Sequence, residues 1–142
     1  MTSELNDLIT TCLDGVHGYK QAAEHATDPS LKTLFTNYAG QRQSYATELQ
    51  GLVRAAGGTP TDDGSVTAAF HRGWIGLKDA VTTGDKGILA ECVRGEEHAQ
   101  KAYAKALGDD DVSAEAKTVL SKQHGEVEQA LAKMNSLHSA AQ

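Results

Sequence analysis

A glutamate interrupts the apolar stripe of segment 89–107, and it constrains the fold more than any other residue. The apolar residues of this segment recur with the three-and-four spacing of a helix that buries one face. They are Leu89, Cys92, Ala99, Tyr103 and Ala106. The position that continues the stripe between Cys92 and Ala99 holds Glu96. A carboxylate on a buried helix face costs free energy unless a cation, a metal ion or hydrogen-bond donors compensate it. The sequence therefore predicts a helical fold with a polar centre that contains Glu96.

Three other segments show the same helical spacing, and the four together predict an all-α four-helix bundle. The expected helices run from about Ser3 to Ala26, from Pro29 to about Ala56, from 86 to 107 and from about Ala114 to Leu137. No stretch alternates between apolar and polar residues with a period of two, so no strand is predicted. Within the first helix, Gly15 and Gly18 are expected to allow the close approach of a neighbouring helix.

The helix ends carry capping signals. Ser3 is the expected N-cap of the first helix, and Asp28 is that of the second, where Pro29 takes the first helical position. Asp111 or Ser113 is expected to cap the last helix. Short turns make the first two helices one antiparallel hairpin and the last two helices another.

A long connection, residues 57–85, joins the two hairpins and can cross the whole bundle. Ser65 is expected to cap a short extra helix that ends near Val81 and carries Phe70 and Trp74 on its apolar face. These aromatic residues are either a lid on the bundle or a surface patch that packs on another copy. The chain is expected to form one domain over residues 1–142.

Composition excludes several classes of function. The formal net charge is -6 and no basic run occurs, so no nucleic-acid partner is expected. No apolar run approaches the roughly 20 residues of a membrane span, and the polar start of the chain predicts no signal peptide. Cys12 and Cys92 lie on apolar faces, which predicts buried free thiols in a reducing compartment. The expected location is therefore cytoplasmic, without a membrane partner.

Three motifs carry a resemblance to known proteins. They are Leu13-Asp14-Gly15-x-x-Gly18-Tyr19-x-x-Ala22-Ala23-Glu24, Phe70-His71-Arg72-Gly73-Trp74-x-x-Leu77-Lys78 and Glu91-Cys92-x-Arg94-Gly95-Glu96. Over nearly its whole length the chain resembles an uncharacterised bacterial family of ferritin-like four-helix bundles that is labelled only as a domain of unknown function. The residues Gly95-Glu96 followed by Ala99 and Tyr103 also resemble the third-helix signature of rubrerythrin- and bacterioferritin-type proteins. The resemblance implies a ferritin-like fold with a stress-related or binding role.

The expected central layer does not match a ferritin-like di-iron centre. Such a centre needs a Glu from each of two helices and a Glu-x-x-His from each of the other two. Counting outward from the turns places Cys12, Arg42 and Tyr45, Glu96, and His124 and Val127 in this layer. Only Glu96 has a side chain suited to its place, and a shift of the last helix by one residue gives Gln123-x-x-Glu126 instead. The resemblance also implies that Tyr45 stands where a ligand His would be.

Two interpretations follow. In the first, the core-facing slot of the second helix belongs to Arg42 or Gln41, and Arg42 pairs with Glu96 in place of metal ions. Tyr45, Tyr103 and His124 then add hydrogen bonds, and the protein is a non-enzymatic bundle without a cofactor that self-associates, as a dimer. In the alternative, iron or manganese binds at an atypical centre of Glu96, His124 and Glu126. A scaffold role, in which an exposed helix face docks another protein, is a third hypothesis. No nucleophilic triad, Cys–His pair or phosphate loop is visible in the sequence.

Overall fold

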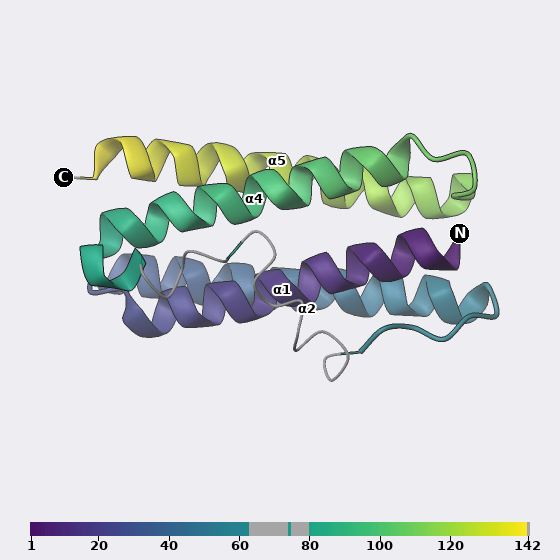
Figure 1. Cartoon of the computed structure of the whole chain (residues 1–142), viewed down its shortest axis with the longest axis horizontal. Helices are drawn as coiled ribbons and strands as arrows, with labels where there is room; N and C mark the ends of the chain where they lie inside the picture. Colours follow the sequence, from purple (N-terminus) through teal and green to yellow (C-terminus); the bar gives the residue numbers. More distant parts are fainter. Residues whose placement is uncertain (63–73, 75–79, 142) are drawn as a thin grey trace.

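Four long helices make up most of the protein (Figure 1). The structure, a computed structural model, describes residues 1–62, 74 and 80–141. The elements are α1 (Thr2–His25), α2 (Pro29–Ala55), the short 3₁₀ helix η2 (Val81–Thr83), α4 (Asp85–Leu107) and α5 (Ala114–Ala140). No strand occurs within these described ranges, and the predicted all-α bundle is confirmed. The extra helix predicted for 65–81 falls mostly outside the described residues.

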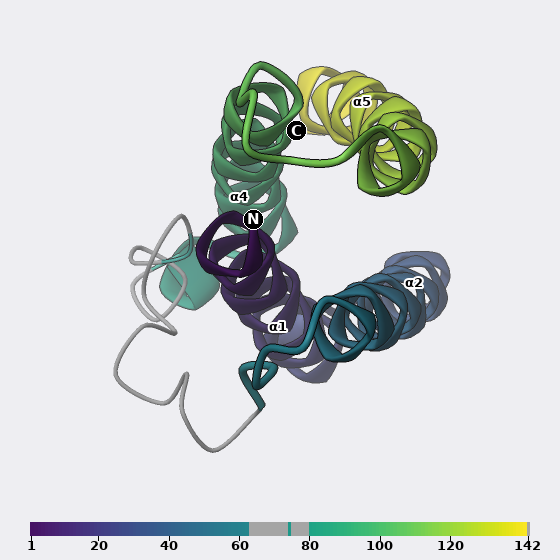
Figure 2. The same cartoon turned by 90° about the vertical axis from the view of Figure 1, so that its right-hand side faces the viewer.

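The helices form two antiparallel hairpins that lie one above the other (Figure 1). Helix α1 packs against α2 and α4, and α4 packs against α5. Viewed along the bundle, the side between α2 and α5 is wider than the other three sides (Figure 2). Side chains rather than closely packed backbones must therefore connect α2 to α5.

Two of the predicted helix starts are confirmed. The Asp28 carboxylate accepts a hydrogen bond from the backbone N–H of Ser30 at 2.8 Å, with Pro29 as the first helical residue. Of the two candidates at the start of α5, Ser113 is the cap, because its hydroxyl accepts from the N–H of Ala116 at 3.1 Å.

The predicted cap of the first helix is wrong. Helix α1 begins at Thr2 with Met1 as its N-cap, and Ser3 lies inside the first turn. The carbonyl of Met1 accepts from the N–H of Leu5 at 3.1 Å, which extends the helix past Ser3. After the C-terminal end of α2, Gly57 adopts a φ of 83°, so the helix cannot continue beyond this residue.

The apolar core falls into two clusters that lie on either side of the middle of the bundle. One cluster surrounds Leu5, Leu49, Tyr103 and Leu120 and fills the end where α1 begins. The other surrounds Phe35, Trp74, Ile88 and Met134 and fills the opposite end. Buried polar side chains occupy the level between the clusters, so the polar centre predicted from Glu96 is bounded by apolar residues at both ends.

The indole of Trp74 lies in the interior, at 3 % exposure, against Gly18 of α1 and Gly95 of α4. Its ring meets the ring of Tyr19 edge-on, with the ring centroids 4.9 Å apart. Trp74 is therefore buried within its own chain, and the surface-patch alternative is wrong for this residue. Gly18 makes room for this side chain rather than for a neighbouring helix.

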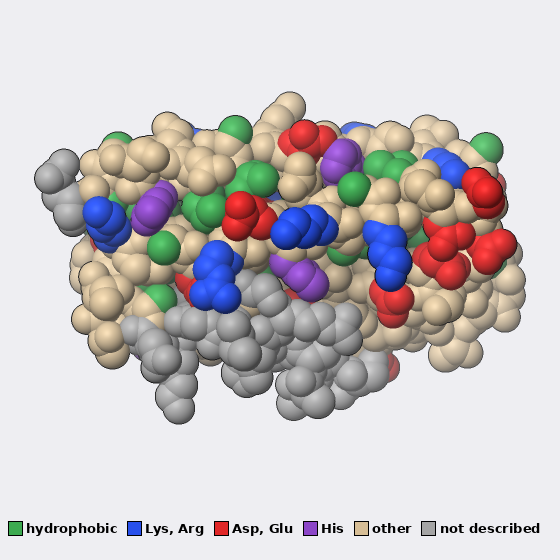
Figure 3. Space-filling model, turned by 45° about the horizontal axis from the view of Figure 1, so that its top comes forward, with side chains coloured by type: hydrophobic (Ala, Val, Ile, Leu, Met, Phe, Trp, Pro, Cys, Tyr) green, Lys and Arg blue, Asp and Glu red, His purple; other side chains and the backbone are tan. Residues whose placement is uncertain are grey.

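The surface carries charges of both signs along the face drawn in Figure 3, with acidic side chains gathered at one end. Among the described residues, no helix is long and apolar enough to cross a membrane.

Replacement of Gly18 by alanine is expected to destabilise the protein, although alanine favours helices. A Cβ atom at this position would lie 2.6 Å from Cε2 of Trp74, so the indole would have to move, at a cost of about 1–3 kcal/mol. The matched control is Gly40→Ala in α2, where a Cβ meets nothing within 4 Å and the free energy of unfolding should rise by about 0.5–1 kcal/mol. Urea denaturation of both variants measures the difference. Equal stability of the two variants would contradict the close contact between Gly18 and Trp74.

Candidate functional site

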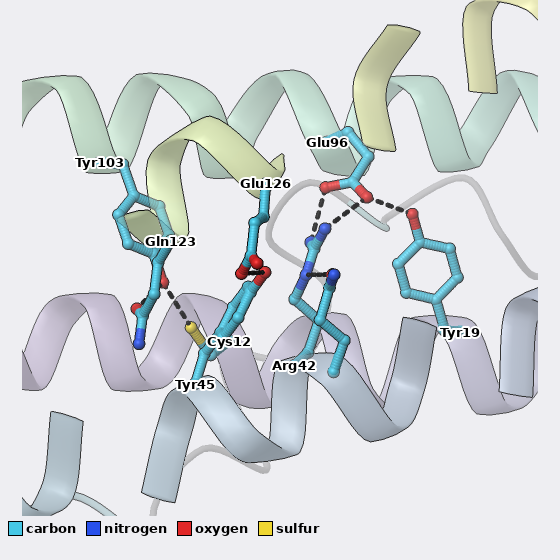
Figure 4. A network of polar contacts seen from close by, with 9 residues as sticks. Cys12, Tyr19, Arg42, Tyr45, Glu96, Tyr103, Gln123 and Glu126 are labelled. Atoms are coloured by element: carbon cyan, nitrogen blue, oxygen red, sulfur yellow. Dashed lines mark hydrogen bonds and ion pairs between the residues drawn. The ribbon is translucent and has the colours of Figure 1, made fainter. Parts of the chain in front are cut away.

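A two-pronged ion pair between α2 and α4 occupies the centre of the bundle (Figure 4). The Nη1 atom of Arg42 donates to Oε1 of Glu96 at 2.6 Å, and its Nη2 atom donates to Oε2 at 2.7 Å. Arg42 is 2 % exposed and Glu96 is 0 % exposed. The two parallel bonds match the planar guanidinium to the planar carboxylate, which is the strongest geometry for such a pair. The structure thus brings together the two residues that the sequence analysis paired.

Further partners hold both ends of the pair. The hydroxyl of Tyr19 on α1 donates to Oε2 of Glu96, and the Nε atom of Arg42 donates to Oε1 of Gln41 at 3.2 Å. The Cζ atom of Arg42 lies 5.7 Å from the ring centroid of Tyr19 and 5.8 Å from that of Tyr45, within range of a cation–π interaction. Of the two candidates for the core-facing slot of α2, Arg42 is inside and Gln41 is half-buried.

The electrostatics of the centre keep Arg42 charged and Tyr19 neutral. Burial is the largest single effect on the pKa of Arg42 and lowers it, but the charge and hydrogen bonds of Glu96, together with Tyr19 and Cys12, outweigh burial and raise the net pKa above its ordinary value. Burial, with the charge of Glu96 added, raises the pKa of Tyr19 well above its usual range. Tyr19 is therefore neutral and donates its hydroxyl hydrogen to Glu96.

Tyr45 and Tyr103 take part in separate hydrogen bonds beside the central pair. The hydroxyl of Tyr45 donates to Oε1 of Glu126 on α5 at 2.6 Å. The hydroxyl of Tyr103 donates to Oε1 of Gln123 at 2.6 Å and lies 3.2 Å from Sγ of Cys12. Neither tyrosine hydroxyl bonds to Arg42 or Glu96, so the predicted single layer is divided into three neighbouring groups (Figure 4).

The structure does not place His124 in the central layer. Its side chain is 21 % exposed, and its Nδ1 atom lies 3.1 Å from Oε1 of Glu128 on the same helix. Gln123 takes the interior position instead, at 1 % exposure, and its Nε2 atom donates to Oε1 of Glu48 at 2.8 Å. At this level of the bundle, the buried face of α5 therefore contains Gln123 rather than His124.

The residues of the predicted metal centre do not converge. Glu96 is held by Arg42 and Tyr19, Glu126 accepts from Tyr45, and His124 faces Glu128. Within the described ranges, the group of carboxylates whose oxygens lie within 4.8 Å of one another is Glu4, Asp109 and Asp111, at the end of the bundle. Glu4 and Asp109 are half-buried and Asp111 is exposed, and a cluster of acidic residues does not by itself define a metal site. The donors at the centre do not fit a di-metal site, because a metal ion would have to displace the guanidinium from Glu96.

Two residues of the centre, Tyr19 and Gln123, were not predicted to lie in the central layer, although Gln123 was part of the alternative register Gln123-x-x-Glu126. Both lie on faces that the apolar pattern identified as buried or next to buried, but a periodicity argument counts Tyr19 as apolar and leaves out its hydroxyl. The spacing from Leu120 to Val127 fits an intervening position at 123 or 124 equally well, so the apolar pattern does not distinguish Gln123 from His124. Among the other buried carboxylates, Glu91 pairs with Arg94 at 3.0 Å.

Comparison with known proteins gives the family of this chain. The sequence profile of a family described as a domain of unknown function (DUF2383) matches residues 1–109. No curated protein matches the chain. The matched region contains α1, α2 and α4, and therefore both partners of the central ion pair. Since the profile covers more than half of the sequence, the chain belongs to the DUF2383 family.

Proposed function

We propose that this protein is a non-enzymatic helical bundle of ferritin-like layout that acts by binding through its outer surface. The observation that carries this proposal is the state of Glu96, whose two carboxylate oxygens are both taken by side chains of the same chain at 0 % exposure. A catalytic carboxylate must be able to reach a substrate, a metal ion or a proton donor. Glu96 can do so only if Arg42 leaves it.

The guanidinium supplies the positive charge that metal ions supply in a ferritin-like di-metal centre. A buried ion pair of this kind adds little net stability, because the desolvation of both charges offsets their attraction. Its forked geometry does select one orientation of α2 relative to α4, since only one arrangement satisfies both bonds. The role that fits the pair is therefore to define the packing of the bundle, which leaves function to the surface.

The rival interpretation is an iron or manganese protein whose centre uses Glu96, His124 and Glu126. It requires the Arg42–Glu96 ion pair to break. Glu96, His124 and Glu126, which all have other partners, would then have to turn toward one ion. The two interpretations differ in what a metal ion does to the protein, which makes them easy to separate.

Purified protein is expected to contain no stoichiometric iron or manganese, and its melting temperature is expected to be the same with chelator as with either ion added. Elemental analysis and thermal unfolding of the wild type and Glu96→Gln measure both quantities. A ligand that binds the folded state at 100 times its dissociation constant adds about 2.7 kcal/mol, so a true site would be visible as a shift. One bound ion per chain that disappears in Glu96→Gln would favour the rival interpretation.

Removal of one partner of the central pair is expected to be worse than removal of both. Glu96→Gln and Arg42→Met should each lower the free energy of unfolding by about 3–5 kcal/mol, because each leaves a buried polar group without its partner. The double variant should lose less than the sum of the two single losses. The control is Glu128→Gln, which removes the exposed contact to His124 and should change stability by at most about 1 kcal/mol. Additive losses in the cycle would show that the pair is not coupled.

The sealed interior also sets the behaviour of Cys12. Burial raises the pKa of this thiol from its ordinary value of 9.0 to about 11, against the smaller opposite effects of Tyr103 and Arg42. The thiol is neutral in both states below pH 9, whereas above that pH the unfolded chain loses its proton first. Cys12 therefore contributes stability that is lost as the pH rises from 9.0 to about 11.

Alkaline solution is accordingly expected to destabilise the wild type more than Cys12→Ala. Urea unfolding at about pH 8 and about pH 10 gives the decrease in the free energy of unfolding for each protein. This decrease should be smaller in the variant. Cys92, whose pKa burial also raises, is present in both proteins and serves as the internal reference. Identical alkaline losses would mean that solvent reaches Cys12.

A further inference from the structure

We propose that the groove between α1 and the C-terminal half of α4 is the surface on which two copies of this chain associate. The groove has a volume of about 330 Å³. The lining residues on which the inference depends are Glu4, Asp7, Leu8, Lys101, Lys105 and Asp109. The central ion pair lies elsewhere, so this inference stands independently of the proposed function.

The two walls of the groove carry opposite charges. Glu4 and Asp7 line the α1 side, and Lys101 and Lys105 line the α4 side, with the acidic Asp109 just beyond the end of α4. The buried side chain of Leu8, which is 1 % exposed, forms part of an apolar floor between them. Acidic side chains also gather at this end of the molecule in Figure 3. A positive wall beside a negative wall is a pattern that favours a partner with the same two walls in reverse order.

The charged groups of Asp7, Lys101 and Lys105 are available to such a partner, whereas the Glu4 carboxylate also lies 3.0 Å from the N-terminal ammonium of Met1. None of the ion pairs among the described residues joins Lys101 or Lys105 to the α1 wall. The side chains of Asp7, Lys101 and Lys105 are exposed. Charges that face a concave surface without a close counter-charge raise the local potential there and guide an oppositely charged surface toward it.

The charged residues of the two walls also lie at similar heights along the axis of the bundle. Helices α1 and α4 run antiparallel, and the Glu4 and Asp109 carboxylates lie within 4.8 Å of each other at the same end. Lys105 lies about one turn inward from Asp109, and Asp7 lies about one turn inward from Glu4. Lys105 and Asp7 therefore stand at similar heights on opposite walls.

If two copies are related by a two-fold axis parallel to the groove, their charged walls are complementary. Rotation about such an axis keeps the height of each residue and exchanges the two sides, so Lys105 of one copy faces Asp7 of the other. The same rotation places the second acidic wall against the first basic wall, as a closed dimer requires. Contacts between surface charges favour specificity and fast association more than high affinity, so the dimer should weaken as salt rises.

Charge reversal tests this surface. Sedimentation velocity of the full chain should show a concentration-dependent dimer at low salt. The basic-wall variant Lys101→Glu/Lys105→Glu and the acidic-wall variant Glu4→Lys/Asp7→Lys should each weaken the dimer by at least about tenfold. An equimolar mixture of the two variants should form a heterodimer with close to wild-type affinity. The control is Lys122→Glu/Lys133→Glu, which reverses two exposed lysines of α5 outside the groove and should leave the dimer unchanged.

Three results would overturn the proposal. They are a monomer up to about 1 mM at low salt, a dimer that persists in both single-wall variants, and a mixture of these variants that remains monomeric. Circular dichroism and the melting temperature of each variant identify any loss of fold, and the mixture uses the same two proteins, so restored association shows that both are folded. A failure here leaves the metal and double-variant tests of the central pair unaffected.

Discussion

The fork between Arg42 and Glu96 is the interaction on which the arrangement of the other elements depends. Two opposite charges lie at the centre of a helical bundle with almost no exposure, and each needs the other to remain there. The surroundings accommodate the larger of the two side chains. Gly15 of α1 faces the aliphatic stem of Arg42, and a Cβ atom there would lie 3.3 Å from its Cγ. The apolar clusters begin on either side of this level, so water is excluded from both directions.

Three buried tyrosine hydroxyls add polar contacts in and beside the Arg42–Glu96 pair, and together these contacts connect all four long helices. Tyr19 connects α1 to α4, Tyr45 connects α2 to α5, and Tyr103 connects α4 to α5. The connection from α2 to α5 is the most significant, because that side of the bundle is the widest. The bonds from Tyr45 to Glu126 and from Gln123 to Glu48 span it with long side chains. A phenol suits this task because its ring fills apolar volume while its hydroxyl satisfies a polar partner.

Periodicity alone predicts the helices, because an apolar residue every three or four positions has one simple explanation. The gap at Glu96 also locates the polar centre, since a charge on a buried face needs a partner, and Arg42 was the available cation. The sequence did not predict which residue of α5 faces the core at this level, because both Gln123 and His124 lie between Leu120 and Val127 at helical spacing. Only the tertiary position of Tyr103, which needs an acceptor for its hydroxyl, favours the amide oxygen of Gln123. The role of Trp74 depends on glycines of two different helices and has no local signal.

The composition of the helices explains why such a bundle benefits from a buried ion pair. Many of its buried residues are alanines, among them Ala39, Ala46, Ala99 and Ala106, and small side chains discriminate weakly between neighbouring rotations of a helix. The Arg42–Glu96 pair discriminates strongly between these rotations. Rotation of α4 by one residue would bring Gly95 or Glu97 toward Arg42 in place of Glu96 and would break the two-bond geometry. A buried guanidinium without its partner costs several kcal/mol, which is a large part of the stability of a small protein. The pair therefore acts mainly against alternative packings, and a sequence rich in alanine can specify one bundle.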